Sequence, residues 1–246
     1  MKTILITGAA SGLGWALSQQ AFALGHRVIM TDMNALQLGA RADALAKEDP
    51  SRVSFHRLDV TDSEAITRLV ALLREKEAGL DVLINNAGIT HRSLADKTDL
   101  AVFRKVMAVD WQGPVELTMA ALPLLRASQG EILCIGSMAG WMPVPGRAAY
   151  CAAKGALTQF FEVLRLELER DNIHVLMVYP SFLDTPIEHN ALGKDGKPAS
   201  HPRSMVGGMR TPEWMVGLID QALTKRQRWL LPEPVSRFGR LLWRFA

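Results

Sequence analysis

Two side chains of this sequence, Tyr150 and Lys154, could together carry a proton in a reaction. Residues four apart on a helix project from the same face, so this spacing sets an ammonium beside a phenol. A free tyrosine loses its proton at about pH 10, which is too high for a base in neutral solution. A neighbouring positive charge favours the phenolate, so we expect Lys154 to lower the pKa of Tyr150 by roughly two to three units.

Short runs of β-type residues alternate along the chain with stretches of helical period, and these elements would have to position the pair. The expected strands are residues 4–6, 28–30, 53–55, 82–84, 132–135, 175–178 and 229–231. Apolar residues in 66–73 and 157–168 follow the spacing of helices that pack on a sheet. Near-continuous apolar strands between helices predict an α/β fold, a doubly wound parallel sheet with helices on both faces. We expect one domain over residues 1–246.

The first expected strand ends in a glycine-rich turn. Glycines permit a tight turn and a close approach of the backbone to a ligand, and the following helix presents free N–H groups to a pyrophosphate. A plain strand-to-helix turn is the alternative, but its place after the first strand of an alternating chain favours nucleotide binding. The candidate contacts are Gly8, Ser11, Gly12, Leu13 and Gly14.

Asp32 follows the second expected strand, about twenty residues beyond these glycines. A carboxylate there can accept hydrogen bonds from the ribose hydroxyls of adenosine, and it repels a 2′-phosphate. No Arg or Lys lies in residues 31–34 to receive that phosphate. The sequence therefore favours NAD, with NADP as the alternative cofactor. Asp32 could instead cap the next helix, a task that Asn34 could also perform.

With these motifs in place, the sequence resembles the short-chain dehydrogenase/reductase family over nearly its whole length, which implies a Rossmann-like fold. The motifs stand in order and at family spacing: the glycine turn, Asp59-Val60, Asn85-Asn86-Ala87-Gly88, Ser137 with Tyr150 and Lys154, and Pro180 to Thr185. The resemblance implies cofactor contacts from Asp59, Val60, Asn86, Ala87, Gly88, Tyr150, Lys154, Pro180 and Thr185.

The resemblance also implies a reaction, the reversible transfer of hydride between nicotinamide and a secondary alcohol or ketone. Tyr150 would take the hydroxyl proton in oxidation and donate it in reduction. Lys154 would also bind the nicotinamide ribose, and Ser137 would hydrogen-bond the substrate oxygen. Since relatives usually form dimers or tetramers, we expect a homodimer or homotetramer.

The chain departs from the family pattern at Asp110 and at Ser181. Asp110 stands where the family carries an asparagine that helps to hold a water beside the lysine. An ionised carboxylate cannot donate a hydrogen bond. It would also attract Lys154 and weaken its effect on Tyr150. Either Asp110 is a tolerated substitute, or it slows proton relay and shifts the pH optimum. Ser181 replaces a glycine and narrows the choice of backbone conformation.

The substrate is poorly specified by the sequence. The expected walls are residues 89–92, residues 138–144 and a substrate loop at 184–210. Apolar residues in 141–144 and at 182 suit a fatty, terpenoid, aromatic or steroid-like alcohol, and ordinary packing explains them equally well. Five residues could bind an anion, although solvated loop positions explain them better: His91, Arg92, His189, His201 and Arg203. No set of side chains has metal-ligand spacing.

Composition bounds the remaining possibilities. Hydrophobic residues make up 48% and charged residues 22%, which indicates an ordinary globular protein. A net charge of +3 without an internal basic cluster argues against a nucleic-acid partner. The basic and apolar tail at 236–246 could lie on a membrane surface, but packing within or between subunits is favoured. The sequence shows no signal peptide and no apolar run long enough to span a membrane. The two cysteines are expected to be buried and unpaired, so we expect a cytoplasmic protein.

Three functions compete. A NAD-dependent alcohol dehydrogenase or carbonyl reductase leads. The second is a nucleotide-sensing protein that keeps the fold without turnover, for which Asp110 is the single argument. The third is an epimerase or dehydratase, whose substrate regions are usually longer than this chain offers.

Overall fold

The computed structural model describes residues 1–180, 182–200 and 208–233 of the chain. Seven strands form one sheet in the order β3-β2-β1-β4-β5-β6-β7, and each neighbouring pair is parallel. The strands are β1 (Thr3–Thr7), β2 (Arg27–Asp32), β3 (Val53–Arg57), β4 (Val82–Asn85), β5 (Glu131–Ile135), β6 (His174–Val178) and β7 (Trp229–Leu230). The doubly wound parallel sheet is confirmed, although β7 ends one residue earlier than expected.

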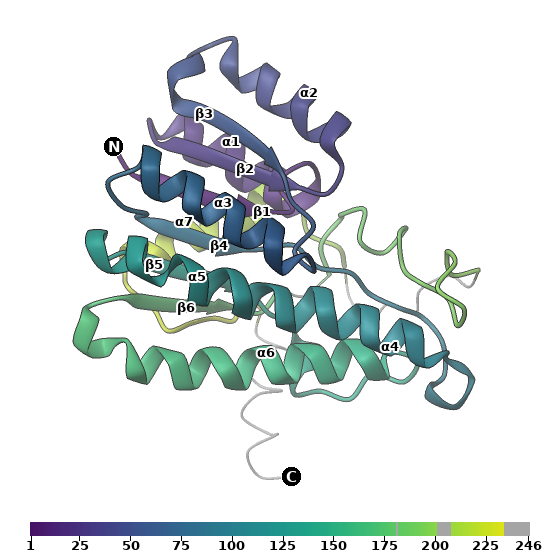
Figure 1. Cartoon of the computed structure of the whole chain (residues 1–246). Coiled ribbons are helices and arrows are strands. Elements are labelled where there is room, and N and C mark those ends of the chain that lie inside the picture. The colour runs from purple at the N-terminus through teal and green to yellow at the C-terminus, as the bar shows by residue number, and fades with distance from the viewer. Residues whose placement is uncertain (181, 201–207, 234–246) are drawn as a thin grey trace.

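Helices cover both faces of this sheet (Figure 1). Helices α3 (Ser63–Lys76), α5 (Gly113–Ser128) and α6 (Ala148–Glu167) pack on one face, and α1 (Gly12–Ala23), α2 (Ala35–Ala46) and α7 (Pro212–Thr224) on the other. The short α4 (Leu100–Met107) packs beside α6 and runs into a π-helical segment, Ala108–Gln112. Single 3-10 turns span Pro50–Arg52, Ala95–Lys97, Met138–Gly140 and Glu169–Asp171.

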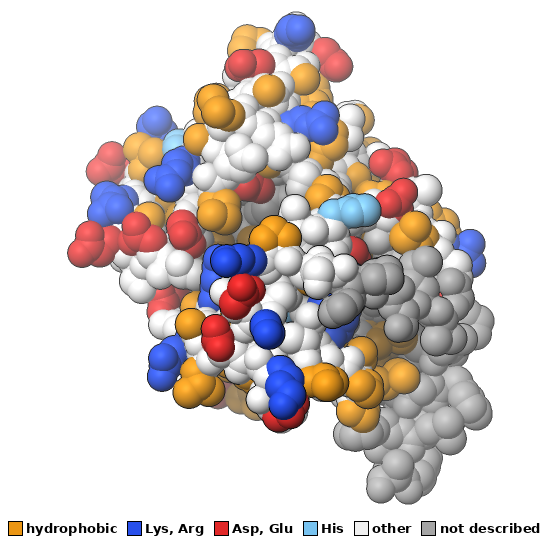
Figure 2. Space-filling model, turned by 90° about the vertical axis from the view of Figure 1, so that its right-hand side faces the viewer, with side chains coloured by type: hydrophobic (Ala, Val, Ile, Leu, Met, Phe, Trp, Pro, Cys, Tyr) orange, Lys and Arg blue, Asp and Glu red, His pale blue; other side chains and the backbone are white. Residues whose placement is uncertain are grey.

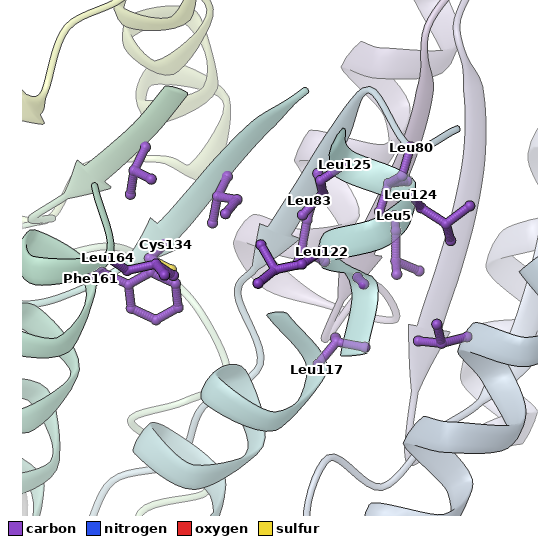
Figure 3. Close-up of a cluster of buried hydrophobic side chains, with 14 of the residues drawn as sticks. Leu5, Leu80, Leu83, Leu117, Leu122, Leu124, Leu125, Cys134, Phe161 and Leu164 are labelled. Atoms are coloured by element: carbon purple, nitrogen blue, oxygen red, sulfur yellow. The ribbon is translucent and has the colours of Figure 1, made fainter. Parts of the chain in front are cut away.

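Alternation along the strands divides the core into two layers, because successive side chains of a strand point to opposite faces. Leu5 and Leu83 belong to the same cluster as Leu117 of α5 and Phe161 of α6 (Figure 3). Their neighbours, such as Ile6, belong to the opposite layer, with α1 and α7. The strands are therefore buried on both faces, which explains their continuous apolar runs.

The strand order reverses beside β1, so the carboxyl ends of β1 and β4 meet where such folds bind ligands. Thr7 joins these ends: its hydroxyl donates to the Ile84 carbonyl at 3.3 Å and accepts from the amides of Asn86 and Ala87, both at 3.0 Å. Figure 2 shows the molecule from this edge, where acidic, basic and hydrophobic side chains are mixed. The polar residues at the strand ends thus share one side of the molecule.

Both cysteines are free; Cys134 is buried in β5 and Cys151 is partly exposed in α6. Within the described ranges, no helix combines the length and the apolar character that a membrane crossing requires. Ser181, His201, Arg203 and the tail at 236–246 lie outside the described residues.

Candidate active site

The turn after β1 is compact because glycine occupies three of its positions. Gly8 and Gly12 have φ values of +67° and +52°, a region that favours glycine. A Cβ atom on Gly14 would lie 2.1 Å from the Gly8 carbonyl oxygen. Ser11, the first residue before α1, makes no side-chain capping hydrogen bond. The first-turn N–H groups of α1, which begins at Gly12 and Leu13, are therefore available to an anionic ligand, and the turn fits a pyrophosphate.

The segment after β4 fixes this turn from the neighbouring strand. Asn86 donates from Nδ2 to the carbonyl oxygens of Thr7 at 2.9 Å and Gly8 at 3.2 Å. Ala87 lies against Gly8, where a Cβ atom would come within 3.0 Å of the Ala87 Cα. Asn85 instead faces the interior and donates to the Thr118 hydroxyl at 2.8 Å. Asn86 and Ala87 thus lie against the glycine turn, and Asn85 belongs to the core.

Asp32 lies against the same turn from the end of β2. Its carboxylate accepts from the amide of Ala10 at 3.1 Å and from the amide of Asn34 at 2.9 Å. Asn34, and not Asp32, caps α2 by accepting from the Gln37 amide at 3.1 Å. The capping alternative for Asp32 is therefore wrong, and its position suits contact with a ribose.

The remaining residues expected to contact the cofactor lie near the carboxyl ends of the strands. Asp59 accepts from the amide and hydroxyl of Thr61 at 2.9 and 2.8 Å, so it also holds the turn that leads to α3. Val60 is buried, and its carbonyl oxygen lies where a Cβ atom on Gly113 would collide, at 2.5 Å. Thr185 lies against the glycine turn, since a Cβ atom on Gly12 would come within 3.1 Å of it. Pro180 is buried just beyond the end of β6.

The residues predicted to carry the proton come from α6 and from the segment that follows β5. Ser137 follows β5, and its hydroxyl accepts from the Ala139 amide at 3.2 Å. The Ser137 side chain also lowers the pKa of the partly buried Tyr150 phenol. Lys154 Nζ donates to the Ile135 carbonyl oxygen at 3.1 Å and lies 5.8 Å from the centroid of the Tyr150 ring. The helical spacing therefore sets the ammonium beside the phenol, as the sequence predicts.

Asp110 lies directly beside this pair, in the π-helical segment. Its side chain has no exposed surface; one oxygen accepts from the Ile89 amide at 2.7 Å, and the other lies 3.5 Å from Lys154 Nζ. A Cβ atom on Gly88 would come within 3.5 Å of both Asp110 and Lys154, so Gly88 adjoins the same group. The expected attraction between Asp110 and Lys154 is present.

The net pKa of Tyr150 differs from the sequence-based expectation. Burial raises the pKa of the Tyr150 phenol, and the charge of Asp110 raises it further. Lys154 lowers this pKa, as predicted, but the net pKa still lies above the ordinary value. For Lys154, burial favours a lower pKa, yet the charges of Asp110 and Tyr150 outweigh it and hold the pKa above the ordinary value. Burial also raises the pKa of Asp110, against the opposing effect of Lys154. The pKa of the Tyr150 phenol therefore lies above its ordinary value in this structure.

Two of the candidate anion-binding residues are not solvated as expected. His91 is fully buried, and burial, reinforced by Arg147, lowers its pKa. Arg92 pairs with Glu188 at 3.4 Å, so a carboxylate of the protein already meets its charge. His189 is exposed, as predicted. The solvated-loop interpretation was wrong for His91 and Arg92 because the segment around residues 186–192 packs on them.

The expected apolar wall is partly exposed. Met142 and Val144 are exposed beyond Ser137, whereas Trp141 packs edge-on against Tyr179, with centroids 4.4 Å apart. Packing therefore explains Trp141, while its neighbours remain available to a substrate. Within the described part of the chain, no group of three His, Cys, Asp or Glu residues could hold a metal ion.

Sequence reasoning missed Thr7, Arg147 and Glu188. Thr7 begins the glycine motif, and its place at the end of the first strand could have marked it. Arg147 and Glu188 are 41 residues apart and form a bidentate ion pair, for which no local pattern gives a signal.

The model of the short chain dehydrogenase family matches residues 2–195 of the chain. The protein belongs to this family. Dehydrogenase/reductase SDR family member 7B of Bos taurus is 33% identical over 231 residues, which cover 92% of this chain and 71% of that protein. Estradiol 17-beta-dehydrogenase 2 of Mus musculus is 36% identical over 189 residues, 76% of this chain and 49% of that protein. The enzymes of this family are oxidoreductases.

Solved structures give the same answer. A short-chain dehydrogenase from Streptomyces avermitilis superposes with a TM-score of 0.83 at 30% identity, covering 98% of this chain and 93% of that one. One from Sphingobium yanoikuyae in complex with NADPH has a TM-score of 0.83 at 25% identity, with 98% and 92% covered. One from Burkholderia phymatum in complex with NAD has a TM-score of 0.86 at 21% identity, with 98% and 92% covered, and that likeness shows the fold alone. Among these structural neighbours, one is thus bound to NADPH and another to NAD.

Proposed function

We propose that this protein is a nicotinamide-dependent oxidoreductase that interconverts an apolar secondary alcohol and its ketone, with Tyr150 as the acid–base group. The observation that carries the proposal is that Ser137 and Lys154 both act on the Tyr150 phenol, beside a glycine turn that fits a pyrophosphate. The dinucleotide supplies the hydride acceptor or donor. Ser137 orients the substrate oxygen toward the phenol, and Tyr150 moves the proton at that oxygen. Lys154 stays protonated and holds the nicotinamide ribose.

A panel of alcohols and ketones, followed through NADH and NADPH absorbance, tests this function directly. We expect turnover of uncharged aromatic, terpenoid or steroid-like compounds, because Met142 and Val144 offer apolar surface and Glu188 neutralises the nearby arginines. The similarity to estradiol 17-beta-dehydrogenase 2 supports the same substrate class. Cofactor binding without turnover of any compound would favour the nucleotide-sensing alternative, which Asp110 alone supports; the assembled Ser137, Tyr150 and Lys154 argue against it.

The cofactor is proposed to be NAD, because Asp32 places a carboxylate against the turn where a 2′-phosphate would come. Arg57 is the partner of Asp32 in the β2–β3 register, which keeps NADP as the alternative. Replacing Asp32 with alanine is expected to raise the ratio of kcat/KM with NADP to that with NAD by roughly tenfold or more, since a charge repulsion is lost. Steady-state kinetics with both cofactors measure this ratio, and an unchanged ratio would contradict the assignment.

Asp110 is proposed to set the pH dependence of the reaction. Oxidation requires the Tyr150 phenolate; because burial and Asp110 raise the pKa of that phenol, the oxidation rate is expected to climb toward alkaline pH. Replacing Asp110 with asparagine removes a negative charge that disfavours the phenolate, so the pH profile of kcat should move to lower pH. Replacing Asp96, an exposed carboxylate paired with Lys97, should leave the profile in place. If the profile of the Asp110 variant does not move, Asp110 is a tolerated substitute.

The oligomeric state and the cellular location of the protein are also proposals. We propose a homodimer or homotetramer through α6 and the helical residues 102–112, which run on into α5. Met119 of α5 and Val163 and Leu166 of α6 are exposed. Light scattering of the purified protein would determine the mass of the assembly. A cytoplasmic location is likewise proposed, and fractionation of cells that produce the full chain would test it. We propose no nucleic-acid partner and do not favour membrane contact through the tail.

A further inference from the structure

Residues 182–200 connect the cofactor turn to the start of the catalytic helix. Thr185 lies against Gly12 of the turn. Three residues later, Glu188 reaches Arg147, the residue that precedes α6 and stands three positions before Tyr150. The segment thus extends from the cofactor side of the site to the side that carries the acid–base group.

Glu188 is held by two arginines, and one threonine neighbours them, a group that we name the Glu188 cluster (Thr90, Arg92, Arg147 and Glu188). Arg147 binds both carboxylate oxygens, at 3.1 and 2.7 Å, which is the strong bidentate geometry. Arg92 donates to the Glu188 backbone carbonyl at 2.7 Å, and Arg147 also lies 3.3 Å from the Thr90 hydroxyl. The three charged side chains are only 13–18% exposed, so solvent screens this cluster less than it screens the surface pairs.

A short backbone ladder continues the same attachment. The Leu192 amide donates to the Thr90 carbonyl oxygen at 2.9 Å, and the Arg92 amide donates to the Leu192 carbonyl oxygen at 2.7 Å. His91 lies between these two bonds, fully buried, and neither ring nitrogen has a hydrogen-bond partner among the described residues. Two unpaired buried nitrogens cost stability. The docked segment therefore packs on a residue whose burial costs stability, and the ion pairs of the Glu188 cluster hold the segment beside it.

We propose that Glu188 is a positioning residue, which fastens residues 182–200 to the start of the catalytic helix and so completes the substrate site. It touches no reacting atom. Its loss is expected to loosen substrate binding and to leave proton transfer at Tyr150 in place. This role rests on the proposed oxidoreductase function for its kinetic consequence, but the attachment itself does not.

Replacing Glu188 with glutamine tests the attachment, because glutamine keeps the size and removes the charge. Hydrogen exchange of the full chain should show the Arg92 and Leu192 amides exchanging at least about tenfold faster, while the amides of β1 keep their protection. In kinetics on a compound that the wild type turns over, KM should rise about tenfold and kcat should stay within twofold, since only ordering of the site is lost.

Glu77→Gln is the matched control. Glu77 pairs with Arg27 at 2.9 Å, is 11% exposed and follows α3, away from the site. The substitution should lower stability in the same manner without changing KM or the exchange at Leu192. Unchanged exchange at Arg92 and Leu192 in Glu188→Gln would overturn the proposal, as would a fall in kcat with KM unchanged. If the wild type turns over no compound, the proposed function fails, and the exchange result alone still decides whether Glu188 fastens the segment.

Discussion

Replacing Tyr150 with phenylalanine is expected to lower kcat by at least about 100-fold, since a positioned acid–base group contributes that much or more. Phenylalanine keeps the ring, so the packing of α6 against α4 and the position of Lys154 should persist. The variant loses only the hydroxyl whose pKa Ser137 and Lys154 lower. Steady-state and single-turnover rates in both directions, with cofactor affinity measured by NADH fluorescence, would show whether chemistry alone is affected.

Tyr179→Phe provides the matched control, because Tyr179 is the other of the two tyrosines of the chain. It is fully buried beside Trp141, at the end of β6. Removal of its hydroxyl should change kcat by less than about threefold, even though the same atom is deleted. A Tyr150→Phe variant that retained more than a tenth of the wild-type kcat would exclude Tyr150 as the proton carrier.

The strands and the glycine turn were predictable because each depends on local chemistry. Strands buried on both faces must be continuously apolar, and residues 4–6 or 175–178 show this directly. The turn needs glycine at fixed positions, and those positions can be read without coordinates. The spacing of Tyr150 and Lys154 is equally local, since one helix carries both.

The electrostatics of the site could not be predicted in the same way. The pKa of Tyr150 is a sum over Lys154, Asp110, Ser137 and burial by several segments, and burial is visible only in the folded chain. The helical spacing predicted that Lys154 lowers this pKa, but it could not predict the larger rise that burial causes. Glu188 escaped for a related reason: its partner Arg147 lies 41 residues away, and the two meet only because a loop folds back over the carboxyl edge of the sheet.

Replacing Gly14 with alanine is expected to have a comparably large effect, on binding and stability and not on chemistry. The added Cβ atom would lie 2.1 Å from the Gly8 carbonyl oxygen and 2.5 Å from Asn86 Nδ2, so backbone must move. Movement of Gly8 breaks the Asn86 hydrogen bonds that join the ends of β1 and β4. We expect the free energy of unfolding to fall by about 3 kcal/mol, the upper end for an overpacked site. Affinity for NADH should fall by at least about 100-fold, because the pyrophosphate cradle is displaced.

Gly217→Ala separates this collision from the general effect of adding a methyl group to a helix. Gly217 lies in α7, and among the described residues no side chain and no other element would come within 4 Å of a Cβ atom added there. Alanine should therefore stabilise the protein by up to about 1 kcal/mol through helix propensity. Denaturant unfolding and NADH titration of both variants give the two quantities needed. Should Gly14→Ala bind NADH within twofold of the wild type, the turn after β1 does not cradle the dinucleotide. A loss of affinity confined to Gly14→Ala would place the pyrophosphate at this turn and leave Tyr150 within reach of the nicotinamide end.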